Sequence, residues 1–75
     1  MFYDMEKLGK IFRETRLKRN LSTYNVGIDI KVDGSILRKI ENGEAKQLSL
    51  NTYLKFCRYY ALDPIEVLKE VFPNT

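Results

Sequence analysis

The chain has almost none of the side chains that catalysis and metal binding use. It contains no histidine, which excludes histidine-based acid–base catalysis and histidine metal ligands. Its one cysteine, Cys57, can form neither an internal disulfide nor a cysteine-rich zinc site. It has no glycine-rich phosphate loop and no nucleophile–base pair at a supporting spacing. We therefore expect a protein that is not an enzyme and that uses no metal and no cofactor.

The basic side chains are the remaining candidates for chemistry, and they suit a polyanionic partner. The chain has 13 Lys and Arg against 10 Asp and Glu, a net charge of +3. The excess lies in residues 1–20, where six basic residues accompany three acidic ones, whereas residues 21–45 are slightly acidic. A basic segment of this kind favours a nucleic acid as partner. A solvated helix face is the alternative that charge alone leaves open.

A chain of 75 residues is expected to form a single domain, spanning residues 1–75, with a small core. Apolar residues make up 44% of the chain, which is typical of a folded globule. The longest apolar run, residues 59–62, is far too short to span a membrane. The N-terminus carries Asp4 and Glu6 where a signal peptide would be basic and then apolar. The sequence therefore predicts a soluble cytoplasmic protein that does not bind a membrane.

The first element that could position the basic residues is a helix near the N-terminus. Leu8, Ile11 and Phe12 follow helical spacing, with charged residues between them. Asp4 can cap the start of this helix. Asn20 can end it, because asparagine tolerates the left-handed conformation.

Two further helices are predicted in the second half of the chain. Ser49 caps the first of them. Asp63 followed by Pro64 and Glu66 is a strong start signal for the second, which Pro73 ends. The apolar residues recur at helical spacing in both: Leu50, Tyr53, Leu54, Cys57, Tyr60 and Ala61 in the first, Leu68 and Val71 in the second.

The middle of the chain permits two structures. Ile28, Ile30 and Val32 alternate with charged residues, which is typical of a β-strand. The alternative is a helix over residues 23–30, a turn, and a second helix that begins after Asp33. Local pattern does not separate these alternatives.

Several short motifs occur in one register along the chain. They are Leu8-Gly9, Phe12-Arg13, Arg16, Leu21-Ser22, Val26-Gly27, Val32, Ile40-Glu41-Asn42-Gly43, Ser49-Leu50 and Asp63-Pro64. In this arrangement, from about Leu8 to Leu68, the chain resembles the Xre-type helix-turn-helix family of small phage repressors and Cro proteins. The resemblance implies an all-α fold, a compact five-helix, lambda-repressor-like domain with a central helix-turn-helix. It also favours the helical structure for residues 23–30.

The resemblance implies that the chain binds double-stranded DNA. The second helix of the motif, the recognition helix, lies in the major groove. The residues in its base-reading positions are Gly34, Ser35, Arg38 and Lys39. The residues in positions that contact backbone phosphates are Thr23, Lys31, Asn42, Lys46 and Gln47. Arg16 and Glu41 match a buried ion pair that ties the first helix to the recognition helix.

Some residues depart from the pattern of the family. Lys31 replaces a glycine that is usual in the turn, so its side chain must point outward, where it would add a phosphate contact if it faces DNA. Gly34 has no side chain with which to contact a base. Asp33 and Glu44 add negative charge near the expected phosphate contacts. The acidic balance of residues 21–45 and the glycine at position 34 support an alternative function, a protein-interaction module that keeps the fold but binds a partner protein instead of DNA.

The function that the resemblance implies is transcription regulation, by repression of a mobile-element or toxin–antitoxin operon. One such domain contacts too few base pairs to act alone, so we expect a symmetric homodimer on a two-fold DNA site. The expected dimer contacts are surplus apolar residues, with Val71 and Phe72 near the axis: Phe2, Tyr3, Tyr59, Val71 and Phe72. We expect regulation through dimerisation, abundance or a second protein, such as a cognate toxin or an anti-repressor.

Overall fold

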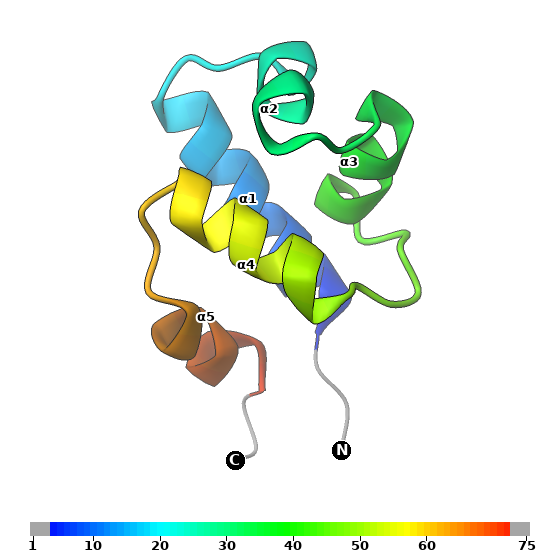
Figure 1. Cartoon of the computed structure of the whole chain (residues 1–75). Helices are drawn as coiled ribbons and strands as arrows, with labels where there is room; N and C mark the ends of the chain where they lie inside the picture. The colour runs from blue at the N-terminus through cyan, green and yellow to red at the C-terminus, as the bar shows by residue number, and fades with distance from the viewer. Residues whose placement is uncertain (1–3, 73–75) are drawn as a thin grey trace.

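The computed structural model of the chain describes residues 4–72 and contains five α-helices and no β-strand in that range. The helices are α1 (Met5–Lys18), α2 (Thr23–Ile30), α3 (Gly34–Glu41), α4 (Leu50–Tyr59) and α5 (Pro64–Val71) (Figure 1). They pack into a body of 34 × 23 × 20 Å. The prediction of a five-helix, all-α domain with a central helix-turn-helix is confirmed, and residues 23–30 are helical. None of the helices between residues 4 and 72 is long and apolar enough to cross a membrane.

Each helix begins at a side chain that caps its free backbone amides. The carboxylates of Asp4, Asp33 and Asp63 and the hydroxyls of Ser22 and Ser49 accept hydrogen bonds from amides two or three residues later. Such caps stabilise a helix because its first amides have no partner within the helix. The five helix starts are therefore local properties of the sequence.

The connections that follow α1, α2, α3 and α4 each turn through a left-handed residue. Asn20, Lys31, Gly43 and Ala61 have φ angles of 56°, 59°, 74° and 54°. Asparagine and glycine tolerate this conformation, whereas Lys31 and Ala61 adopt it at a cost of roughly 1–2 kcal/mol each. The side chain of Lys31 is exposed, as predicted for this position.

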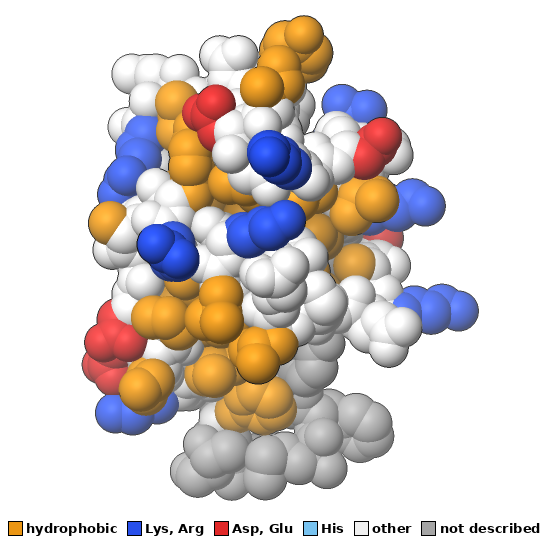
Figure 2. All heavy atoms as spheres, viewed as in Figure 1, with side chains coloured by type: hydrophobic (Ala, Val, Ile, Leu, Met, Phe, Trp, Pro, Cys, Tyr) orange, Lys and Arg blue, Asp and Glu red, His pale blue; other side chains and the backbone are white. Residues whose placement is uncertain are grey.

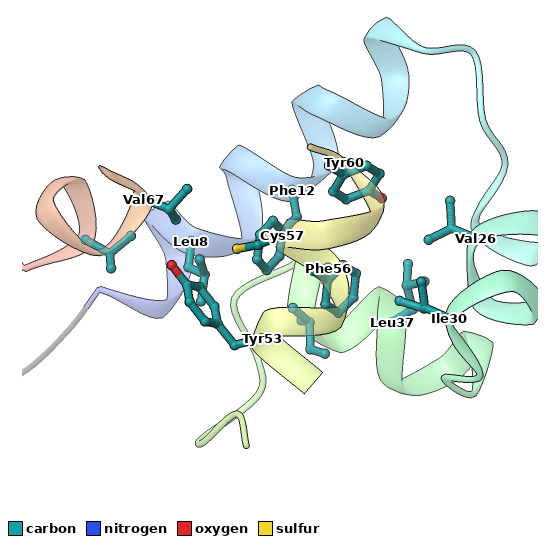
Figure 3. Close-up of a cluster of buried hydrophobic side chains, with 12 residues drawn as sticks. Leu8, Phe12, Val26, Ile30, Leu37, Tyr53, Phe56, Cys57, Tyr60 and Val67 are labelled. Carbon is teal, nitrogen blue, oxygen red and sulfur yellow. The ribbon is translucent and has the colours of Figure 1, made fainter. Parts of the chain in front are cut away.

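The centre of the core is a cluster of aromatic rings from α1 and α4 (Figure 3). Phe12 of α1 stacks on Phe56 of α4, with the ring centroids 4.6 Å apart. Tyr53 of α4 and Tyr60, which directly follows α4, flank Phe12, and each ring centroid lies 6.2 Å from that of Phe12. Aromatic rings bury a large apolar area in such arrangements. The buried residues of the helix-turn-helix belong to the same core, so this cluster supports the motif from the interior.

The apolar face of α4 differs from the predicted one. Phe56 is fully buried, although the prediction omits it. Leu50 and Leu54, which are predicted to face the core, are 69% and 37% exposed. Ala61 is also exposed, in the turn after α4. The prediction for these residues is wrong because helical spacing defines a stripe but not the side from which other helices cover it.

The end of α5 belongs to the core. Val71 is fully buried, and its carbonyl oxygen accepts a hydrogen bond of 2.9 Å from the amide of Asp4 at the start of α1. The prediction that Val71 lies at a dimer axis is therefore wrong, because the chain itself already covers this side chain. Phe72 is half-buried. The other predicted contacts, Phe2 and Tyr3, lie outside the described residues.

Candidate DNA-binding surface

The helix-turn-helix consists of α2 and α3, and Gly27 lets its turn close against α2. A Cβ atom at Gly27 would lie 2.7 Å from the carbonyl oxygen of Val32, closer than real contacts allow. The amide of Val32 donates a hydrogen bond of 2.9 Å to the carbonyl of Gly27. Only glycine leaves space here, and the group that approaches it belongs to the turn and not to α3.

A close backbone contact at Gly9 places α3 on α1. A Cβ atom at Gly9 would lie 2.8 Å from the carbonyl oxygen of Glu41 and would also clash with the carbonyl oxygen of Ile40. Only glycine leaves space for this approach. The end of α3 therefore lies directly against the first turns of α1.

An ion pair also joins α3 to α1, and the predicted pairing of Arg16 with Glu41 is confirmed. Nε of Arg16 donates to Oε2 of Glu41 at 2.8 Å, and Nη2 donates to Oε1 at 3.0 Å. Nη1 donates to the carbonyl oxygen of Leu21 at 2.9 Å. The two side chains are only 12% and 4% exposed, and the pKa of Arg16 is raised, mainly because Glu41 accepts these hydrogen bonds. Such a two-pronged pair fixes orientation as well as distance.

The outer face of α3 carries the residues predicted to contact bases. Leu37 points into the core, and Ser35, Arg38 and Lys39 are exposed on the other side. Gly34 is half-buried, and the place where its Cβ would be is open space. A helix is narrow enough to enter the major groove of DNA, which is about 12 Å wide. The inner face of α3 is thus held by the protein while its basic outer face is free to bind.

The hydroxyl of Ser35 is already engaged at the start of α3. It donates to Oδ1 of Asp33 at 2.6 Å, and the amide of Ser35 donates to the same atom at 2.8 Å. These hydrogen bonds lower the pKa of Asp33, and the one from the hydroxyl contributes most. Because a hydroxyl has a single proton, Ser35 can offer DNA only its lone pairs. It would therefore suit the amino group of adenine or cytosine, the donors in the major groove.

The residues predicted to contact phosphates lie around α3. Thr23 is the first residue of α2 and is half-buried, and Lys31 follows the other end of α2. The remaining three are exposed in the segment after α3: Asn42, Lys46 and Gln47. The structure brings Lys31 together with Gly34 in one surface depression and with Gln47 in another.

Two further basic residues approach this surface, and the sequence-based prediction omits them. Lys55 and Arg58 are three residues apart on α4, so they share a face of that helix. Together with Lys31 they line a depression between α2 and α4. Their spacing of three residues indicates that they share a face of one helix. It does not indicate which other helix packs beside that face, so the sequence did not connect them to the DNA-binding surface.

Tyr59 lies away from Phe72, another predicted dimer contact. Its hydroxyl donates to Oδ2 of Asp29 at 2.6 Å, which joins α4 to α2. This hydrogen bond is the main cause of the raised pKa of Tyr59. Phe72 instead lines a groove beside Leu50. The structure therefore does not bring Tyr59 and Phe72 into one surface.

The only thiol of the chain has no chemical role in this structure. Cys57 is fully buried in the core, and burial raises its pKa. A thiol with a raised pKa is a poor nucleophile, so Cys57 acts as a small apolar residue. Residues 4–72 contain no cluster of three or more side chains suited to hold a metal ion.

The arrangement of helices is similar to that of a solved controller protein. The restriction-modification controller protein C.AhdI from Aeromonas hydrophila aligns with a TM-score of 0.77 and 28% sequence identity. The alignment covers 85% of this chain and 96% of that chain. No family model matches the chain, and a search of curated proteins found no match. The chain thus shares its all-α, helix-turn-helix fold with a restriction-modification controller protein.

Proposed function

We propose that the chain is a sequence-specific transcription regulator that binds double-stranded DNA as a homodimer. The observation that carries this proposal is the outer face of α3, where Ser35, Arg38 and Lys39 are exposed. The buried pair of Arg16 and Glu41 holds this helix on α1, so it can enter the major groove without rearrangement. The similarity in fold to a restriction-modification controller protein supports the same function.

Repression is the mode of regulation that we propose. A domain that occupies the major groove over a promoter excludes other proteins from the same DNA. The regulated operon would belong to a mobile element, a toxin–antitoxin pair or, by similarity to C.AhdI, a restriction–modification system. A reporter gene placed behind the bound site tests the direction of regulation, because a repressor lowers its expression and an activator raises it.

Selection of bound sequences from random duplex DNA tests DNA binding and site symmetry together. We expect enrichment of a two-fold symmetric site whose half-sites lie about one helical turn, roughly 34 Å, apart. Lys39→Ala should change the preference at one base pair of this site, whereas Lys69→Ala, which alters an exposed ion pair on α5, should leave the preference unchanged. If the wild type enriches no sequence and binds no duplex at low salt, the proposed function is wrong.

An apolar surface on α4 and α5 is the proposed homodimer interface. Leu50, Ile65 and Leu68 are 69%, 65% and 37% exposed. Leu50 and Leu68 also line a groove of about 190 Å³ together with Phe72. Figure 2 shows apolar side chains gathered over α5 and the start of α4. Exposed apolar clusters are typical of interfaces, so we place the two-fold axis beside this surface.

Sedimentation at micromolar concentration tests this interface. Ile65→Asp is expected to give a monomer, because it would bury a charge between the two copies. Leu17→Asp is the matched control, since Leu17 is 51% exposed on α1 and should leave the dimer intact. A monomeric wild type, or an Ile65→Asp variant that still dimerises fully, would contradict the interface.

A protein-interaction module is the second candidate function, and an exposed apolar pair on α2 favours it. Tyr24 and Ile28 are 72% and 56% exposed and line one depression with Gly34. A salt titration separates the candidates. The affinity of a DNA-binding protein falls log-linearly with salt, with a slope of about −0.9 for each phosphate neutralised. A module that binds only a partner protein would show little duplex binding even at low salt.

A further inference from the structure

We propose that Lys31, Lys55 and Arg58 form an additional phosphate-binding site, on which the backbone of the bound duplex continues beyond the recognition helix. We call these three residues the α2–α4 basic ridge. The inference rests on the proposed DNA binding and extends it, since it assigns DNA contacts to α4. It predicts a longer footprint on DNA than the helix-turn-helix makes by itself.

Lys31 stands where three surface depressions adjoin. It lines one with Gly34 at the start of α3 and a second, of about 280 Å³, with Gln47 between α3 and α4. It lines a third, of about 390 Å³, with Lys55 and Arg58 between α2 and α4. Lys31 and Lys55 both line the second and the third depression. The depression beside α3 and the one on the basic ridge therefore share two lysines as lining residues.

The charges of the ridge are not neutralised within the described part of the chain. The ion pairs between residues 4 and 72 join Arg16 to Glu41 and Lys69 to Glu66, and neither involves the ridge. One acidic residue, Asp29, lines the same depression, and it accepts a hydrogen bond from a tyrosine hydroxyl. Figure 2 shows Lys and Arg side chains gathered between α2 and α4 on this face. The ridge thus presents unpaired positive charge next to the candidate DNA-binding surface.

The backbone of Lys31 also points to a role for its side chain. Its φ and ψ are 59° and 48°, a conformation that glycine adopts without strain. Ala61 shares this strained conformation, so what distinguishes Lys31 is its charge. A lysine here places a cation at the junction of the three depressions, where a glycine would place none.

The chemistry of the ridge fits a phosphate backbone better than a protein partner. Protein interfaces have an apolar centre. The apolar residues that line this depression are Ile30, which is buried, and Tyr59, which is half-buried with its hydroxyl engaged. Residues 21–45 are slightly acidic, so cations from α4 would add attraction for DNA that the helix-turn-helix lacks.

The salt dependence of DNA affinity tests the ridge. The probe is a labelled duplex that carries the site enriched by selection, with long flanks, and the protein is the full chain. The double variant Lys55→Gln, Arg58→Gln should bind more weakly, with a salt slope shallower by about two units per bound protomer. Lys69→Gln is the control: it also removes a cation, but on α5, and its DNA affinity should have the same salt slope as that of the wild type. A double variant with the wild-type slope would overturn the ridge.

The length of the duplex provides a second test. Trimming the flanks to the outer ends of the half-sites should weaken the wild type severalfold and should leave the double variant unaffected. Equal losses for both proteins would show that the ridge does not contact the flanks and would overturn the inference. A wild type that binds no duplex at all would instead overturn the proposed function itself.

Lys31→Gly tests the effect of the Lys31 side chain separately from the effect of its left-handed backbone conformation. It should raise the melting temperature, because glycine adopts the left-handed conformation freely, yet lower DNA affinity and reduce the salt slope by about one unit. Ala61→Gly is the matched control, since Ala61 has the same conformation with a φ of 54° and carries no charge. It should also raise the melting temperature but bind DNA as the wild type does. Wild-type DNA binding by Lys31→Gly would exclude Lys31 from the ridge and overturn the site as proposed.

Discussion

Replacing Glu41 with alanine tests whether the tie between α1 and α3 carries a large part of the stability of the domain. The variant removes the oxygens that accept hydrogen bonds from Arg16 at 2.8 Å and 3.0 Å. The Arg16 side chain is 12% exposed, so its charge would remain in the protein interior without a counterion. Breaking one side of a buried ion pair costs about 3–5 kcal/mol for this reason. Arg16 keeps its hydrogen bond to Leu21, which favours the lower end, about 3 kcal/mol.

A loss of this size would be serious for so small a domain. At typical values per residue, a chain of this length is stable by roughly 4–11 kcal/mol. Urea denaturation followed by circular dichroism measures the free energy of unfolding directly. We expect Glu41→Ala to unfold at far lower urea concentration than the wild type, or to be unfolded already in buffer.

Two other variants keep the reasoning testable if Glu41→Ala does not fold. Arg16→Lys keeps the charge but loses the two-pronged geometry, so we expect a loss of about 1–2 kcal/mol. Lys69→Ala breaks an ion pair of 3.1 Å whose side chains are 70% and 62% exposed, and it should cost less than about 0.5 kcal/mol. The reasoning is refuted if Arg16→Lys is as stable as the wild type, or if Glu41→Ala costs no more than Lys69→Ala.

Gly9→Ala is expected to destabilise the domain by about 1–3 kcal/mol, because the new Cβ would clash with carbonyl oxygens at the end of α3. Thermal denaturation measures this, with Gly34→Ala, whose Cβ would meet nothing within 4 Å, as the control that should lose nothing. Tyr60→Phe should keep the stability at neutral pH or raise it by up to ~1 kcal/mol, since the buried hydroxyl has no hydrogen-bond partner among residues 4–72. Burial raises the pKa of Tyr60 to about 12, so the fold favours the neutral ring and the wild type should lose stability as the pH rises from about 10 towards 12. Tyr60→Phe should lose less over that range in denaturant melts, and equal losses would contradict the assignment. Lys39→Ala should change the preference at one base pair by about 1–3 kcal/mol, whereas Lys46→Ala should weaken binding to all sequences alike in competition assays. Identical behaviour of these two variants would show that the recognition face is misplaced.

Helix boundaries are the feature that local sequence determined most directly. Ser49 and Asp63 mark the starts of α4 and α5, and Asn20 follows the end of α1, as predicted. A cap needs only one side-chain oxygen and amides two or three residues later, so no distant contact is involved. The stop at Asn20 is likewise a property of one residue.

Residues 27–33 show where local pattern reached its limit. Ile28, Ile30 and Val32 alternate with charged residues as in a strand, yet Ile28 is 56% exposed and Ile30 only 7%. Alternation fits a strand and a short helix equally well when burial is unknown. The resemblance favoured a helix, and the structure shows the packing reason, because the carbonyl of Val32 occupies the space beside Gly27.

Tertiary structure alone decided which apolar side chains are covered and which cations meet. Phe56 and Val71 lie in the core while Leu50 and Ile65 are exposed, although nothing in their local sequence separates them. Lys31 meets residues of α4 only because α2 and α4 pack side by side. The sequence determined the chemistry that is available: basic side chains, no histidine and one thiol. How these side chains come together in one surface depends on contacts between helices. The residues next to them along the chain do not specify those contacts.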